Sequence, residues 1–75
     1  MWFEAKVQFK TEETARKVLR HLQHKGFLIG AKFSSIKVST PQGDNYCVVA
    51  NVQEKEHQQY VLFFMKGVQW AKEIA

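Results

Sequence analysis

The chain has 75 residues, of which 45% are hydrophobic and 13% aromatic, and its formal net charge is +4. This length limits it to one small domain over residues 1–75, and the share of large apolar side chains excludes a disordered chain. The positive charge favours nucleic acid, anionic lipid or an acidic protein as partner, although lysines that only aid solubility would give the same composition.

The sequence predicts a cytoplasmic protein that does not enter a membrane. Cys47 is the only cysteine, which rules out an intramolecular disulfide and is typical of a reducing compartment. The longest apolar run, residues 60–65, is much shorter than the roughly 18 residues of a transmembrane span. The N-terminal residues also lack the basic-then-apolar pattern of an export signal.

The first element is predicted to be a strand that is followed by a helix. Residues 2–10 alternate apolar and polar side chains, which is typical of a half-buried strand. Its apolar side is formed by Phe3, Ala5, Val7 and Phe9. Thr11 then has the position of a helix N-cap, with two acids in the first turn. Lys25 and Gly26 would supply a cation and a glycine cap at the other end, so we expect a helix over residues 12–25.

A β-hairpin is predicted in the middle of the chain. Residues 27–40 suit a strand whose apolar pattern changes phase halfway, which a bulge at Ser34 and Ser35 would explain. Turn-forming residues are concentrated at 40–45, so this strand should fold back on residues 46–53. The returning strand is apolar on both faces, which predicts a central or covered strand.

The C-terminal third has two interpretations. As a helix, it would carry an apolar stripe at spacings of three and four, with Asn51 and Glu54 as a capping box. The predicted stripe consists of Tyr60, Phe63, Phe64, Gly67, Trp70, Ala71 and Ile74, broadened by Val61, Met65 and Val68. As a strand, residues 60–65 would add to the sheet before a short helix. The helix is preferred because residues 53–59 contain no Gly, Pro, Asn or Asp for a tight turn.

With the helix, the predicted fold is a small two-layer α+β sandwich in the order β-α-β-β-α, with both helices on one face of the sheet. It resembles a ferredoxin-like unit that lacks its last strand, a likeness of architecture that does not imply an activity. The alternative order is β-α-β-β-β-α, with residues 60–65 as a fourth strand. A missing strand leaves a sheet edge unpaired, so a homodimer formed through a sheet edge or the C-terminal helix would cover it.

Basic side chains are concentrated on the first predicted helix. On the side away from its core face, or beside that side, lie Arg16, Lys17, Arg20, His21, His24 and Lys25. Lys6, Lys10, Lys32 and Lys37 would extend this surface, and Trp2 is the candidate for stacking on a base. The pattern is consistent with a nucleic-acid-binding surface, and a solvated helix face is the alternative explanation.

No residue pattern indicates catalysis, a cofactor or a metal. His21 and His24 have the spacing of two ligands, with His57 as a third, but the Cys or carboxylate partners that zinc prefers are missing. Both histidines are instead expected to gain positive charge near pH 6.5. Cys47 lies in an apolar strand, which favours a buried side chain over a nucleophile.

The sequence therefore predicts a non-enzymatic binding module that acts through a surface. One hypothesis is nucleic-acid binding through the basic face of the first helix. The other is a small adaptor, inhibitor or subunit that binds a protein. It would use a sheet edge or an exposed apolar and aromatic patch such as Trp2, Trp70 and surplus side chains of residues 60–65.

Overall fold

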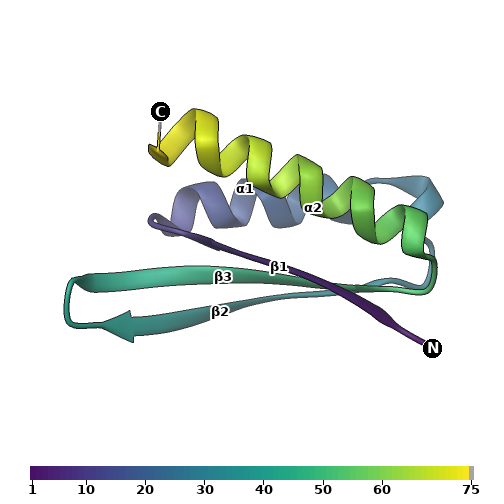
Figure 1. Cartoon of the computed structure of the whole chain (residues 1–75), viewed down its shortest axis with the longest axis horizontal. Helices are drawn as coiled ribbons and strands as arrows, with labels where there is room; N and C mark the ends of the chain where they lie inside the picture. The colour runs from purple at the N-terminus through teal and green to yellow at the C-terminus, as the bar shows by residue number, and fades with distance from the viewer. Residues whose placement is uncertain (75) are drawn as a thin grey trace.

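The chain folds into a three-stranded antiparallel sheet with two helices on one of its faces (Figure 1). The computed structural model describes residues 1–74, except for the side chains of Phe27 and Ile74. The elements in chain order are β1 (Phe3–Phe9), α1 (Glu12–Gln23), η1 (Gly26–Leu28), β2 (Lys32–Thr40), β3 (Gly43–Val52), α2 (Lys55–Gln69) and η2 (Trp70–Ile74). This order confirms the predicted ferredoxin-like unit without its last strand. The alternative with a fourth strand is wrong, because residues 60–65 lie within α2.

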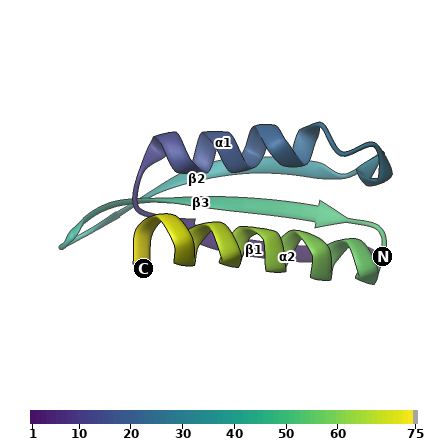
Figure 2. The same ribbon diagram turned by 90° about the horizontal axis from the view of Figure 1, so that it is seen from above.

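The sheet has the strand order β1-β3-β2, so β3 is the central strand, as predicted. Both β1 and β2 pair antiparallel with β3 and form the two edges of the sheet. Viewed from above, α1 lies over the β2 side of the sheet and α2 over the β1 side (Figure 2). We call the sheet surface opposite the helices the open face.

The core lies between the sheet and the helices. The buried apolar residues of this layer are Ala5, Val7, Phe9, Ala15, Val18, Leu22, Leu28, Val48, Ala50, Val52, Val61 and Met65. Each large side chain that is fully buried contributes about 1.5–3 kcal/mol relative to an exposed one. The predicted alternation of β1 is confirmed, since its odd-numbered residues face this core. No helix in the described part of the chain is long and apolar enough to cross a lipid bilayer.

Helix α1 begins as predicted and ends earlier. The Thr11 hydroxyl accepts a hydrogen bond from the Thr14 backbone N–H at 3.2 Å, which confirms the N-cap. The last helical residue is Gln23, and Gly26 begins the 3-10 turn η1 instead of forming a glycine cap. This early end allows η1 to bury Leu28 in the core. The chain then turns into β2 at Gly30, whose φ of 85° is a conformation that suits glycine.

Strand β2 begins later than predicted and contains no bulge. Its pairing with β3 is continuous from Lys32 opposite Asn51 to Thr40 opposite Gly43. The change of phase has another cause. Phe33 lies on the helix side of the continuous strand, whereas Ile36 and Val38 have the other parity and lie on the open face. The tip of the β2–β3 hairpin extends past the ends of both helices (Figure 1).

Helix α2 buries only part of the predicted stripe, whose members Tyr60, Val61, Phe64, Met65 and Val68 lie in the core or pack against it. Val61 and Met65 are fully buried, whereas the predicted core residues Phe63 and Trp70 are 73% and 64% exposed. The Ile74 side chain, which belonged to the same prediction, lies outside what the structure describes. Glu54 is the N-cap and makes no side-chain capping bond, while Asn51 is still in β3, so the predicted capping box is wrong as well.

Side chains of the C-terminal helical segment close the free edge of β1. The Gln58 amide donates to the Glu4 carbonyl oxygen at 2.8 Å, and the Gln69 amide donates to the Gln8 carbonyl oxygen at 2.6 Å. The Glu73 carboxylate in the π-helical turn η2 accepts from the Lys10 backbone N–H at 2.7 Å. The edge that a missing strand would leave open is therefore bonded by α2 and η2.

Candidate functional site

Two of the exposed cations of α1 form ion pairs with acids on the same helix. Arg16 pairs with Glu12, and the Lys17 ammonium lies 3.0 Å from the Glu13 carboxylate, both one helical turn apart. The hydrogen bond from Lys17 also lowers the pKa of Glu13 below its ordinary value. These pairs are exposed, so they add little stability. They do reduce the positive potential that the helix presents to an anionic partner.

Two other members of the predicted basic stripe face α2. The His21 ring stacks on Phe64 with a centroid distance of 4.2 Å, and its Nε2 lies 3.5 Å from the Tyr60 hydroxyl. The Lys25 ammonium lies 5.9 Å from the centre of the Tyr60 ring. Both side chains are half-buried between the helices, so of the predicted six only Arg16, Lys17, Arg20 and His24 are exposed.

The strand lysines do not extend the surface of α1. Lys6 and Lys32 lie on the open face, with the Lys32 ammonium 5.5 Å from the centre of the half-exposed Trp2 ring. Lys37 lies on the helix side at the hairpin, where its ammonium is 3.2 Å from the Asp44 carboxylate. Lys10 follows β1 and borders a hollow beside the hairpin turn. The predicted nucleic-acid-binding residues are thus divided between opposite faces of the sheet.

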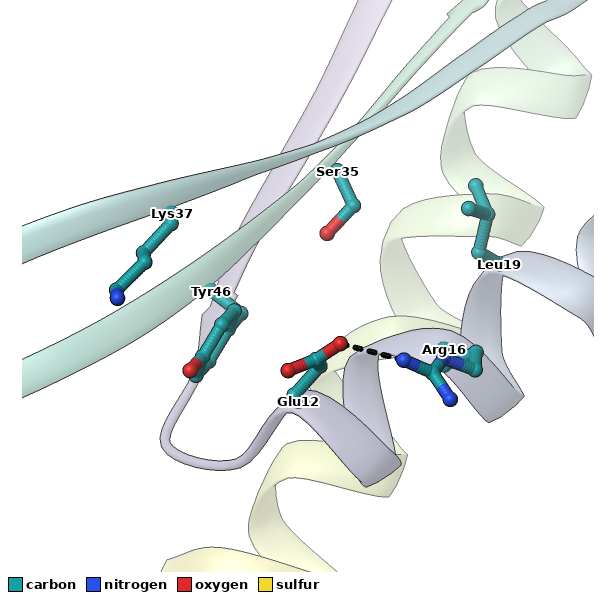
Figure 3. Close-up of a pocket in the computed structure, with 6 residues that line it drawn as sticks. All are labelled: Glu12, Arg16, Leu19, Ser35, Lys37 and Tyr46. Carbon is teal, nitrogen blue, oxygen red and sulfur yellow. Dashed lines mark hydrogen bonds and ion pairs between the residues drawn. The ribbon is translucent and has the colours of Figure 1, made fainter.

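A hollow of about 400 Å³ lies between α1 and the hairpin (Figure 3). Glu12, Arg16 and Leu19 line it from the helix, and Ser35, Lys37 and Tyr46 line it from the strands. Figure 3 shows Glu12 bonded to Arg16 on the helix, across the hollow from Lys37. It is an open hollow with charges of both signs, and sequence reasoning did not predict it because its residues come from three separate elements.

Two of the three histidines considered as ligands contact other side chains, and Cys47 is buried. His57 lies 3.5 Å from the Glu54 carboxylate, and His21 is engaged with aromatic rings. Among the described residues, no group of three or more His, Cys, Asp or Glu side chains could hold a metal ion. Cys47 is 1% exposed, as predicted, and burial raises the pKa of its thiol.

The outer face of α2 carries two large exposed aromatic side chains. Phe63 and Trp70 are seven residues apart, which places them on the same side of the helix, with Gly67 between them. A Cβ atom added to Gly67 would meet nothing within 4 Å. We call Phe63 and Gly67 of α2, together with its C-cap residue Trp70 at the start of η2, the α2 outer face. The sequence had placed all three residues in the core stripe, and it had also offered Trp70 and surplus side chains of residues 60–65 as candidate protein contacts.

Comparison of the chain with protein-family models, with curated proteins and with solved structures found no match in any of the three. Inference about function therefore depends on the surfaces themselves. Among the described residues, the α2 outer face brings two exposed aromatic side chains to one side of a helix.

Proposed function

We propose that the chain is a non-enzymatic protein-binding module that contacts its partner through the α2 outer face. The exposure of Phe63 and Trp70 on one side of a helix is the observation that carries this proposal. Aromatic side chains that insert into a partner's pockets dominate the energy of many interfaces. Anchors seven residues apart, as Phe63 and Trp70 are, also occur where a helix docks into an apolar groove.

Gly67 supports the same interpretation. A glycine inside a helix costs roughly 0.5–1 kcal/mol relative to alanine. No contact within the chain requires it, because a Cβ atom at this position would meet open space. A partner that approaches the helix backbone closely between the two aromatic rings would give the glycine a role.

Nucleic-acid binding through α1 is the competing hypothesis, and the geometry supports it less. A phosphate-binding surface needs several unpaired cations on one face. Arg16 and Lys17 are paired with acids, and Lys6 and Lys32 lie on the opposite side of the sheet from α1. Within the described part of the chain, Arg20 is the arginine of this helix that makes no ion pair.

Site-specific cross-linking distinguishes the two hypotheses. A photoreactive phenylalanine analogue placed at Phe63 should cross-link a protein in an extract of the native host, and nuclease treatment should not remove the product. The matched control carries the same analogue at Ile29, which is 88% exposed but lies outside α2. Equal products from both positions, or products that disappear with nuclease, would contradict the proposal.

A further inference from the structure

Two side chains bond the turn that carries Trp70 to the end of β1. The Gln69 amide, one residue before Trp70, donates to the Gln8 carbonyl oxygen at 2.6 Å. The Glu73 carboxylate, three residues after Trp70, accepts from the Lys10 backbone N–H at 2.7 Å. Both side chains thus bond neighbouring backbone groups of one short segment, from either side of Trp70. We call Gln69 and Glu73 the Trp70 clamp.

The clamp bonds the point where β1 passes into α1. One Glu73 oxygen accepts from the Lys10 N–H, and the other accepts at 3.3 Å from the N–H of Thr11, the N-cap residue of α1. These two bonds span 63 and 62 positions of the chain. Trp70 is therefore held by contacts between elements as well as by the backbone bonds of its own helix.

The clamp lies beyond the part of α2 that the core holds. Val61 and Met65 are fully buried, and Val68 is the last of the described residues that packs against the core. Trp70 is 64% exposed, and residues 71–72 are exposed as well. The last turn of a helix lacks some of its backbone bonds and opens easily when it buries few side chains. The polar bonds of the clamp therefore hold the end of the helix where apolar burial has stopped.

The backbone at this end of the chain has an unusual conformation. Trp70 is the first residue of the π-helical turn η2, and Glu73 lies within the same turn. π-Helical turns are rare and occur frequently at functional sites. The side chains of this turn that the structure describes are exposed or half-buried. Fixing the turn therefore orders the exposed Trp70 more than it adds to the core.

We propose that Gln69 and Glu73 are positioning residues that fix Trp70 for contact with the partner protein, an inference that rests on the proposed function of the α2 outer face. Side chains that are already ordered before association cost less to bind. Phe63 needs no such support, because it lies between Val61 and Met65 of α2, which are both fully buried. The clamp gives the second aromatic anchor the same fixed backbone.

The first test measures the order of the Trp70 backbone in the isolated protein, by NMR relaxation of its amide. The wild type should have an order parameter of about 0.85, the value of rigid backbone. Gln69→Ala combined with Glu73→Ala should lower it to below about 0.6, the range of flexible backbone. Glu73→Gln keeps an acceptor oxygen and should stay near the wild-type value. An unchanged order parameter in the double variant would overturn the proposal.

Gln58→Ala is the matched control, because it separates positioning from a general loss of stability. Gln58 makes the same kind of bond to β1, to the Glu4 carbonyl oxygen at 2.8 Å, but it lies near the other end of α2. Its removal should leave the order parameter of Trp70 unchanged. If Gln58→Ala loosens Trp70 as much as the clamp variant does, the clamp has no positioning role.

The second test adds the clamp substitutions to the protein that carries the photoreactive analogue at Phe63, in extract of the native host. The yield of cross-linked protein should fall about two- to tenfold, the effect of having to order one side chain on binding. Gln58→Ala should leave the yield unchanged. A yield that falls with Trp70→Ala but not with the clamp variant would overturn the positioning role alone. A yield that Trp70→Ala leaves unchanged would contradict the proposed function, and the clamp would lose its role with it.

Discussion

At the scale of single residues, the Lys37–Asp44 pair links stability to pH. Hydrogen bonds from Lys37 and Ser39 hold the pKa of Asp44 below its ordinary value of 3.8. A carboxyl group whose pKa is lower in the folded state stabilises the fold at neutral pH, and this contribution is lost as pH falls through the folded-state pKa. Asp44→Asn should therefore lower the urea midpoint at pH 7, and the difference from the wild type should disappear in acid.

The matched control is Glu56→Gln, which removes an exposed acid from α2. The measurement is a series of urea unfolding curves between neutral and acidic pH for the three proteins. A difference between wild type and Asp44→Asn that stays constant with pH would show that the ion pair does not stabilise the fold.

At the scale of elements, α2 takes the place of the missing fourth strand at the edge of β1. Gln58→Ala combined with Gln69→Ala removes two hydrogen bonds to this edge. It should reduce the free energy of unfolding by about 1–3 kcal/mol, because each such bond contributes about 0.5–1.5 kcal/mol. Light scattering should also show association that increases with concentration, because the edge of β1 becomes available.

Gln59→Ala is the control for this prediction, since Gln59 is exposed on the same helix. If the double variant is as stable and as monomeric as Gln59→Ala, the glutamines do not protect the edge.

A substitution at Gly67 tests the outer face of α2. Gly67→Ala should raise the free energy of unfolding by about 0.5–1 kcal/mol, because the helix is exposed there and a Cβ atom meets no neighbour. The same change should weaken binding of the cross-linked partner if that partner contacts the helix backbone. Thermal unfolding and a binding titration measure the two effects. A gain in stability with unchanged affinity would leave the glycine without a role in binding.

Some elements could be predicted from their local sequence, and others could not. The alternation of β1 and the Thr11 cap are local patterns, and both were predicted. Helix α2 is apolar on nearly all sides, so its periodicity could not show which side is buried, and Phe63 was placed in the core. In β2, Phe33 faces the helices and Ile36 faces the open side of the same unbulged strand, so apolar residues lie on both faces. That arrangement is tertiary, and no local pattern in the strand contains it.

The candidate surfaces depended even more on tertiary structure. The basic stripe of the first helix could be recognised in the sequence. The sequence could not show that His21 and Lys25 turn toward α2, because they contact aromatic side chains 35 to 43 positions later in the chain. The hollow between α1 and the hairpin is likewise lined by residues of α1, β2 and β3, which are far apart in the sequence. The aromatic content of the C-terminal third was the one sequence signal that pointed toward the α2 outer face.

At the scale of the whole molecule, the α2 outer face belongs to the helix that covers the β1 side of the sheet (Figure 2). The Trp70 clamp joins this helix to the junction of β1 and α1 by bonds that span 62 and 63 positions of the chain. The outer face and the clamp can be tested separately because they share no residue.

The most direct test of the central claim is the affinity of the cross-linked partner for three proteins: wild type, Phe63→Ala with Trp70→Ala, and Arg20→Glu. Both aromatic side chains are exposed, so all three proteins should fold alike, which circular dichroism can check. Calorimetry should show that the double aromatic variant binds at least about 100-fold more weakly, because each anchor contributes more than about 1–2 kcal/mol. Arg20→Glu should bind as the wild type does. A loss with Arg20→Glu and none with the aromatic variant would contradict protein binding through α2.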